Sequence, residues 1–316
     1  ARAQLEGMDL RSSIHTDDYR AAVARLSDAY MNAGLPTPAL EVLNRLSRSV
    51  PEDRQSAMLQ AALYRRQGLL EEALKVLDDF ISRQPDRIAQ VKRAELLDEM
   101  ARPQESFQAL LKALEADPLD ESTYDMILSK AEDKPLWRGR KASALLHKGK
   151  PETAMAEMEL ALSMSPRDAG LMMIKVEVLE ALKRPEEAQD LLEEVLERDK
   201  DNPLANLKVA RKFRAQGDKK TALDHYKHML RSDPEASVGW SEVASLLLEM
   251  ERYQESLLSY ERLREVSPDD AQALYGRCTV CAAMKDRPGF DSAARDLLLE
   301  VKDAKAPLYV ADLLIK

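Results

Sequence analysis

Glycine, cysteine and aromatic residues are all scarce in this chain of 316 residues, which contains 10 glycines, two cysteines and 5% aromatic residues. Two cysteines cannot form the disulfide framework on which small secreted domains depend. The abundant residues are instead alanine, leucine, glutamate, lysine and arginine, which favour helix. The composition therefore predicts a helical protein that needs no disulfide bonds.

The chain also lacks a long apolar run and an excess of positive charge. No apolar stretch approaches the roughly 20 residues that span a bilayer, and no signal peptide is visible. The net charge is -9 with both signs mixed along the chain, whereas nonspecific nucleic-acid binding needs a basic face. We therefore predict no membrane insertion by this segment and no nucleic-acid partner.

Motifs that mark catalysis are absent from the sequence. It contains no nucleophile motif, no glycine-rich phosphate loop and no HExxH metal site. Pairs of carboxylates are common, but on the surface of a helix they mainly keep a protein soluble. We therefore predict no catalytic residues, no metal site and no cofactor.

Small residues recur at a nearly constant interval, and most are followed twelve residues later by a proline. The six pairs are Ala39 and Pro51, Ala73 and Pro85, Ser106 and Pro118, Ala154 and Pro166, Ala222 and Pro234, and Ser256 and Pro268. Ala188 is in the same register, with its proline delayed to Pro203. The small residues are 34 apart, except for one step of 33 and one of 48. Such a period is typical of stacked repeats, in which each unit buries a face on its neighbour.

Residues 203–236 show what one unit contains. A helix is predicted over residues 203–216, and Gly217 then permits a backbone conformation that other residues avoid. A second helix follows and ends at Pro234, because proline cannot continue a helix. Ala222 in the second helix lies where the two helices approach closely. The same turn position holds Gly34, Gly68 and Gly149.

This combination of residues resembles the tetratricopeptide repeat (TPR). Trp240, Ala244, Ser256, Tyr260 and Pro268 stand at the family's large-aromatic, small, small, aromatic and proline positions within one unit. Further matches are Tyr30, Gly34, Ala39 and Pro51 in the first unit, and Tyr64, Gly68, Ala73 and Pro85 in the second. The last unit departs from the pattern, with bulky Phe290 where a small residue is expected. The resemblance covers about residues 17–300 and implies an all-α, right-handed superhelix of seven to eight stacked antiparallel helix pairs.

The step of 48 residues identifies an irregularity at residues 120–133. Tyr124, Ile127, Leu128 and Ala131 share one face at helical spacing, which predicts an extra helix there. One interpretation is that this helix bends the superhelix or begins a second subarray, and the other is a degenerate repeat that has lost its partner helix. The predicted organisation is an N-terminal flank (1–16), repeats one to three (17–119), the inserted helix (120–133), repeats four to seven (134–270), and a degenerate terminal repeat with a capping helix (271–316).

The resemblance also implies a concave groove lined by the first helix of each unit. By register, the groove-facing residues are Arg65, Glu95, Asp98, Met173, Glu177, Glu180, Lys208, Arg211 and Arg214. Their charges form blocks in the order basic, acidic, acidic, basic, and such a pattern sets the register and specificity of a partner. The alternative is ordinary charge on helix surfaces.

Two pairs of residues have the spacing of metal ligands. Cys278 and Cys281 form a CxxC sequence, and His225 and His228 are three residues apart on one helix. The cysteines occupy a small and an aromatic position of the repeat, where cysteine packs as a small hydrophobe. We favour packing for the cysteines and surface positions for the histidines.

The leading functional prediction is a non-catalytic scaffold that binds a peptide or helix of a protein partner in the groove. The first alternative is an assembly module of a larger machine, such as a bacterial envelope polysaccharide-export or pilus-type system. The second is a metal or redox protein that uses Cys278 and Cys281. The chain opens at Ala1 and closes in an apolar pattern, so we expect an excised segment of a longer protein whose flanks could join a membrane-associated complex. The compartment stays open between cytoplasm and periplasm.

Overall fold

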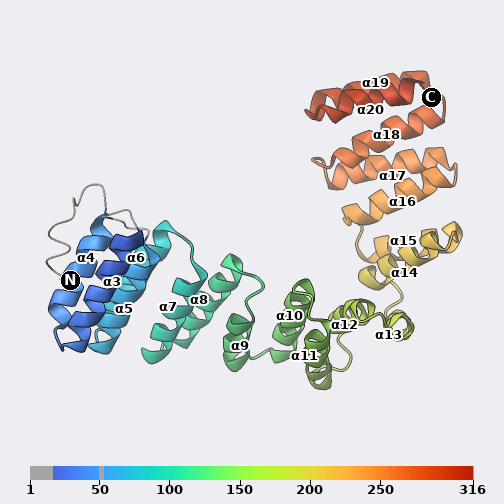
Figure 1. Ribbon diagram of the computed structural model, residues 1–316. Coiled ribbons are helices and arrows are strands. Elements are labelled where there is room, and N and C mark those ends of the chain that lie inside the picture. The colour runs from blue at the N-terminus through green and yellow to red at the C-terminus, as the bar shows by residue number, and fades with distance from the viewer. Residues whose placement is uncertain (1–16, 50–52, 316) are drawn as a thin grey trace. The chain divides into compact units, whose positions relative to one another are not determined.

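The computed structural model describes residues 17–49 and 53–315, and every regular element within them is an α-helix (Figure 1). The predicted N-terminal flank, residues 1–16, and Pro51 lie outside the described residues. The chain divides into two compact units, residues 1–166 and 167–316, and each is described by itself. Consecutive helices pack in pairs within both units, which confirms the predicted all-α fold of stacked helix pairs.

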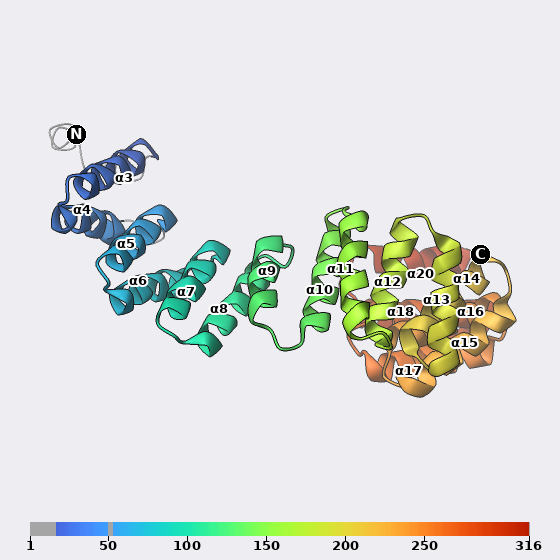
Figure 2. The same cartoon turned by 90° about the horizontal axis from the view of Figure 1, so that it is seen from below.

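In the described residues of unit one there are four helix pairs and one single helix. The pairs are α3 (Asp17–Asn32) with α4 (Pro36–Ser49), α5 (Arg54–Arg66) with α6 (Leu70–Arg83), α7 (Arg87–Glu99) with α8 (Pro103–Ala116), and α10 (Lys134–His147) with α11 (Pro151–Met164). The single helix α9 (Glu121–Lys130) lies between the third and fourth pairs, and Figure 2 shows the helices of this unit following one another in chain order. The extra helix predicted at residues 120–133 is therefore present.

Unit two contains four further pairs and a final helix. The pairs are α12 (Ala169–Ala181) with α13 (Pro185–Arg198), α14 (Pro203–Ala215) with α15 (Lys219–Ser232), α16 (Ser237–Glu249) with α17 (Tyr253–Val266), and α18 (Ala271–Ala283) with α19 (Arg287–Glu300). The final helix is α20 (Lys305–Ile315). We call the earlier member of each pair its first helix and the later member its second helix. First helices of neighbouring pairs contact each other, for example α5 with α7 and α16 with α18.

Aspartate or asparagine residues cap the N-termini of many of the first helices. Asp53, Asp86, Asp168 and Asn202 each accept a hydrogen bond from the backbone N–H three residues further on. This hydrogen bond satisfies a donor that has no partner inside the helix. Pro85 and Pro166 come one and two residues before the caps Asp86 and Asp168, whereas Pro203 directly follows its cap, Asn202, as the first residue of α14.

A residue with left-handed backbone closes the turn inside each pair. In four pairs it is a glycine, and in the other four it is Ala101, Lys183, Glu251 or Lys285, with φ between 55° and 58°. The sequence predicts the four glycine turns but not the other four, since left-handed backbone costs a non-glycine residue roughly 1–2 kcal/mol. The single helix α9 ends differently, in extended backbone at Ala131 (φ -66°, ψ 138°).

Glu251→Gly should raise the free energy of unfolding by about 1 kcal/mol. Relief of the left-handed strain exceeds the extra backbone entropy that glycine has in the unfolded chain. Gly68→Ala is the matched reverse change and should cost a similar amount, because a methyl group at Gly68 meets nothing within 4 Å and only the backbone responds. Urea unfolding of both variants measures the effect, and a Glu251→Gly protein no more stable than the parent would contradict it.

The small residues of the repeat lie at buried contacts between the two helices of a pair. None of the seven is more than 3% exposed: Ala39, Ala73, Ser106, Ala154, Ala188, Ala222 and Ser256. Ser256 also uses its hydroxyl, which donates a hydrogen bond to the carbonyl of Ala244 at 2.7 Å. In the last pair Phe290 is buried in this position, in one cluster with Cys281. Cys281 stands where the second pair has Tyr64. The last pair thus has a small residue on its first helix and a large one, Phe290, on its second, the reverse of Tyr64 and Ala73 in the second pair.

Ala222→Leu should lower stability by roughly 1–3 kcal/mol, because a larger side chain forces apart two helices that are already in contact. Ala222 is fully buried, with 0% of its surface exposed. Ala156→Leu is the control, since Ala156 is an exposed residue of α11. Thermal melting followed by circular dichroism compares the two variants. Equal melting temperatures for Ala222→Leu and the parent would show that the repeat register is wrong.

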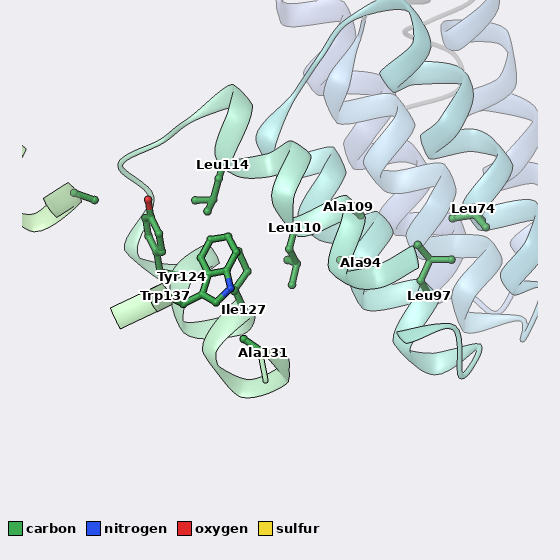
Figure 3. Close-up of a cluster of buried hydrophobic side chains, with 11 residues drawn as sticks. Leu74, Ala94, Leu97, Ala109, Leu110, Leu114, Tyr124, Ile127, Ala131 and Trp137 are labelled. Carbon is green, nitrogen blue, oxygen red and sulfur yellow. The ribbon is translucent and has the colours of Figure 1, made fainter. Parts of the chain in front are cut away.

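One hydrophobic cluster runs without interruption through the single helix α9. Figure 3 shows Leu97 and Leu110 of the third pair together with Ile127 of α9 and Trp137 of α10. The two compact units divide after residue 166 and not at α9. Both α8 and α10 pack on α9, so the packing of unit one continues across the inserted helix. That this helix begins a second subarray stays a prediction.

The start of α9 has the local structure of a first helix. The hydroxyl of Tyr124 donates a hydrogen bond to the carbonyl of Pro118 at 3.1 Å. In the first helix α16, the indole of Trp240 donates in the same way to Pro234, six residues earlier, at 2.8 Å. This similarity favours the interpretation of α9 as a repeat that has lost its second helix.

Candidate functional site

The predicted groove residues of unit one pair with opposite charges on neighbouring first helices. Arg65 of α5 lies beside Glu95 and Glu99 of α7: its Nη1 is 3.6 Å from Glu95 Oε2, and its Nε donates to Glu99 Oε2 at 3.1 Å. Asp98 of α7 accepts a hydrogen bond from Lys130 Nζ of α9 at 2.6 Å. These charges therefore compensate each other along the array and are not free blocks of one sign.

The predicted acidic and basic blocks of unit two pair in the same way. Lys208 Nζ of α14 donates to Glu180 Oε2 of α12 at 2.8 Å. Arg211 Nε and Arg214 Nη1 of α14 donate to the two carboxylate oxygens of Glu242 in α16, at 2.8 Å and 2.7 Å. The three basic residues differ in exposure. The side chain of Arg211 is 54% exposed, whereas those of Lys208 and Arg214 are only 26% and 25% exposed.

Arg214 is the centre of a polar network that we call the Arg214 node. Its guanidinium also donates to Ser245 Oγ at 2.8 Å and pairs with Glu249. The hydroxyl of buried Tyr226 donates to Glu242 Oε2 at 3.1 Å. Burial and the Glu242 carboxylate raise the pKa of Tyr226 to about 12, so the hydroxyl keeps its proton. Burial alone lowers the pKa of Arg214, but its contacts with Glu249 and Glu242 raise it overall.

Met173 and Glu177 of α12 have different surroundings from those of the other predicted groove residues. Met173 is only 3% exposed and belongs to the buried side of a helix that also buries Met172 and Val176. The prediction that Met173 faces a ligand is therefore wrong. Glu177 is exposed, and no ion pair to it occurs among the described residues, so it stays a candidate contact.

An apolar cavity of about 330 Å³ opens between the first helices α5 and α7 of unit one. Its lining residues are Met58, Leu59, Ala61, Ala62, Arg65, Leu77, Ile88, Lys92 and Leu96. Lys92 Nζ lies 2.8 Å from Glu95, the residue that also pairs with Arg65. The cavity thus combines an apolar interior with two cationic side chains whose charges are compensated.

Sequence reasoning found Arg65 in this cavity but missed Met58, Ala62 and Lys92. The signal was present, because Met58, Ala62 and Arg65 follow the i, i+4, i+7 spacing of one helix face. The groove positions predicted on α5 and α7 are all charged, whereas most residues that line the cavity are apolar. The cavity itself depends on how two helices pack, which residue spacing does not specify.

The two cysteines are part of the hydrophobic core of the last pair. Both are buried in the cluster that contains Phe290. Burial raises the pKa of Cys278 to about 11 and also raises that of Cys281. The thiolate is the form that binds metals and reacts in redox chemistry, so these thiols are poorly suited to either role. Within the described residues there is no group of three or more metal-ligating side chains.

Both histidines of α15 have protein partners. His225 Nδ1 lies 2.8 Å from Asn206 Oδ1, and its ring stacks on Phe213. His228 Nδ1 lies 2.6 Å from Asp201 Oδ1. These contacts join α15 to α14 and to the connection before it, so the two rings pack between elements.

Comparison with known proteins identifies the family. Profiles described as tetratricopeptide repeat match residues 24–88, 63–121, 145–211 and 244–288. The chain belongs to the tetratricopeptide-repeat family. TPR folds generally mediate protein–protein interactions, and TPR scaffolds are typically non-catalytic. A search of curated proteins finds no match.

Solved TPR structures are similar to this TPR chain at low identity. The APC/C hetero-tetramer Cut9–Hcn1 has 13% identity and a TM-score of 0.46, over 99% of this chain and 58% of that chain. Yeast Tom70 has 13% identity and a TM-score of 0.49, over 95% of this chain and 61% of that chain. The P58(IPK) TPR domain has 15% identity and a TM-score of 0.34, over 93% and 97%. This TPR chain thus spans about three fifths of the Cut9 and Tom70 chains. In the described part of the chain, no helix has the length and apolarity needed to cross a membrane.

Glu249→Gln should lower the stability of this TPR array slightly at neutral pH. The hydrogen bond from Arg214 holds the pKa of Glu249 below its ordinary value of 4.5. Its carboxylate therefore contributes stability above pH 4.5, and this contribution is lost as the pH falls through the lowered pKa. Because the side chain is 41% exposed, we expect less than about 1 kcal/mol.

Urea unfolding at several pH values measures this difference between variant and parent, which should fade on acidification. Glu235→Gln is the control, since Glu235 is exposed and has no ion pair in the described structure. A difference that persists unchanged at low pH would argue against the ionic contribution of the Arg214 node.

Proposed function

We propose that this chain is a non-catalytic TPR scaffold that binds an extended peptide segment of a protein partner between α5 and α7. The observation that supports this proposal is the cavity of about 330 Å³, with apolar walls and the side chains of Arg65 and Lys92 in its lining. Ligand sites are typically concave and apolar, with a few polar groups that orient the ligand.

The chemistry of the cavity favours an aliphatic anchor residue in the peptide. Arg65 and Lys92 are both close to Glu95, and Arg65 also pairs with Glu99, so the charged rim has little net charge. Burial of the apolar side chain then supplies the affinity, while the charged groups set the direction and register of the peptide. Polar residues that flank the anchor can exchange with these partly exposed ion pairs.

The charged residues of unit two are secondary candidates for contact with a partner. Arg211 and Glu177 are the most available of them, because both are exposed. An acidic residue of a partner would compete with Glu242 for Arg211, whereas Lys208 and Arg214 would have to leave partly buried contacts. In this proposal the latter two residues mainly hold neighbouring pairs together.

The alternative role as an assembly module of a larger machine uses the same first-helix face. No feature of the described residues favours that role over a peptide-binding scaffold. The metal or redox alternative is disfavoured, because the thiols of Cys278 and Cys281 are buried and their pKa values are raised.

Ala62→Phe should weaken peptide binding between α5 and α7, because the exposed methyl of Ala62 lines the cavity and a phenyl group would fill it. Loss of one buried aliphatic anchor costs about 1.5–3 kcal/mol, which weakens binding about 10- to 100-fold. Ala156→Phe is the matched control, since Ala156 is exposed on the second helix α11.

The test captures partners with the parent and both variants, and then measures Kd by calorimetry for peptides from each partner protein. Partners of this cavity bind the parent and Ala156→Phe but not Ala62→Phe, while all three proteins melt alike. If Ala62→Phe retains every partner with the affinity of the parent, this cavity is not the binding site.

A further inference from the structure

A second cavity, of about 460 Å³, lies next to the single helix α9 and is separate from the cavity between α5 and α7. It is bounded by the start of α8, the end of α9 with the connection to α10, and the first turn of α10. Its lining residues are Pro103, Gln104, Phe107, Gln108, Lys130, Ala131, Glu132, Asp133 and Trp137. All of these residues belong to unit one.

The missing second helix explains why a cavity opens here. In each pair a left-handed residue turns the chain, so the second helix folds straight back along the first. After α9 the backbone is extended at Ala131, and the next helix, α10, forms a pair with α11. In a regular array, the second helix of the following pair would pack beside α8. Here that place is bordered by the short connection between α9 and α10 and by Trp137.

Two aromatic side chains, Phe107 and Trp137, are part of the lining of this cavity. The rings of Phe107 and Trp137 meet edge to face, with their centroids 6.0 Å apart. Trp137 is buried in the continuous core, and the guanidinium of Arg140 lies 4.6 Å from the centre of its ring. A large apolar side chain inserted between α8 and α10 would contact Phe107 and the ring of Trp137, which already packs in the core.

The lining of this cavity contains two carboxylate side chains, Glu132 and Asp133, and one ammonium group, Lys130. Lys130 is paired with Asp98 at 2.6 Å, so its charge is compensated. Asp133 accepts a hydrogen bond from the backbone N–H of Leu136 at 3.2 Å as the cap of α10. Glu132 is exposed, and the described structure contains no ion pair to it. A cationic group in a ligand would therefore be attracted to the connection between α9 and α10.

We propose that this cavity is a second docking site, which takes a large apolar side chain next to a lysine or arginine in a peptide segment of a partner protein. The apolar residue fills the space beside Phe107 and Trp137, and the neighbouring basic residue pairs with Glu132. The inserted helix thus adds a binding site with a charge preference of its own to the scaffold.

Trp137 provides a direct signal for occupation of this site. The chain contains two tryptophans, so Trp240→Phe leaves Trp137 as the sole indole fluorophore. The probes are synthetic dodecapeptides without tryptophan, in which one phenylalanine or leucine is followed by lysine, arginine, serine or glutamate. We expect peptides with lysine or arginine to shift the emission of Trp137 and to bind at least fivefold tighter than those with glutamate. Replacing the apolar residue by serine should remove the signal.

Variants of the lining residues separate the two parts of the site. Gln104→Phe, at an exposed position, should fill the cavity and weaken binding at least tenfold. Glu132→Lys should abolish the preference for basic peptides, whereas Glu115→Lys makes the same charge change at the far end of α8 and should leave it intact. Ala62→Phe changes only the cavity between α5 and α7 and should not weaken the binding of these peptides. A loss of binding at the cavity beside α9 can therefore be told apart from a loss of binding between α5 and α7.

Any one of three results would overturn the proposal. The first is that no dodecapeptide binds the parent more tightly than the Gln104→Phe protein. The second is that peptides with glutamate bind as well as those with lysine. The third is that Glu115→Lys changes the preference as much as Glu132→Lys does. Circular dichroism of each variant establishes that its helices are intact before binding is compared.

Discussion

The contact between the two helices of each pair, at a buried small residue, is the constraint on which the rest of this structure depends. A larger side chain at Ala73 or Ala222 would separate the helices, and each pair would then lose the surface that it shares with its neighbours. Because the array has no single central core, its stability is the sum of such contacts within and between pairs. The left-handed turn serves the same contact, since it returns the second helix directly along the first.

Charged side chains on the first helices provide the next level of organisation. Lys208 with Glu180, and Arg211 with Glu242, connect residues that are 28 and 31 positions apart in the chain. A surface that looks in sequence like alternating blocks for a ligand is, in three dimensions, a set of contacts between neighbouring pairs. The apolar cavity beside Arg65 is a better candidate for binding, because burial of an apolar side chain there does not require a charged group to leave its partner.

The inserted helix shows how an array can change its surface without losing its core. Tyr124 and Ile127 keep the hydrophobic cluster continuous between α8 and α10, so the stacking of unit one passes through α9. Only the second helix that would pair with α9 is missing. In its absence, the connection between α9 and α10 and Trp137 border α8. This deviation leaves the core continuous and opens a cavity whose lining includes Phe107, Trp137 and the carboxylate of Glu132.

The sequence by itself determined the pairs of helices, their register and the position of the extra helix. Small residues, prolines and turn glycines act through local backbone and close packing, so their spacing is readable without a structure. It did not reveal the left-handed turns at Lys183 and Glu251, because there the packing of the pair imposes a conformation that the residue itself disfavours. Nor did it reveal the ion-pair partners, the burial of Met173 or the two cavities. Those features depend on which side chains of different helices meet, and only the tertiary structure decides that.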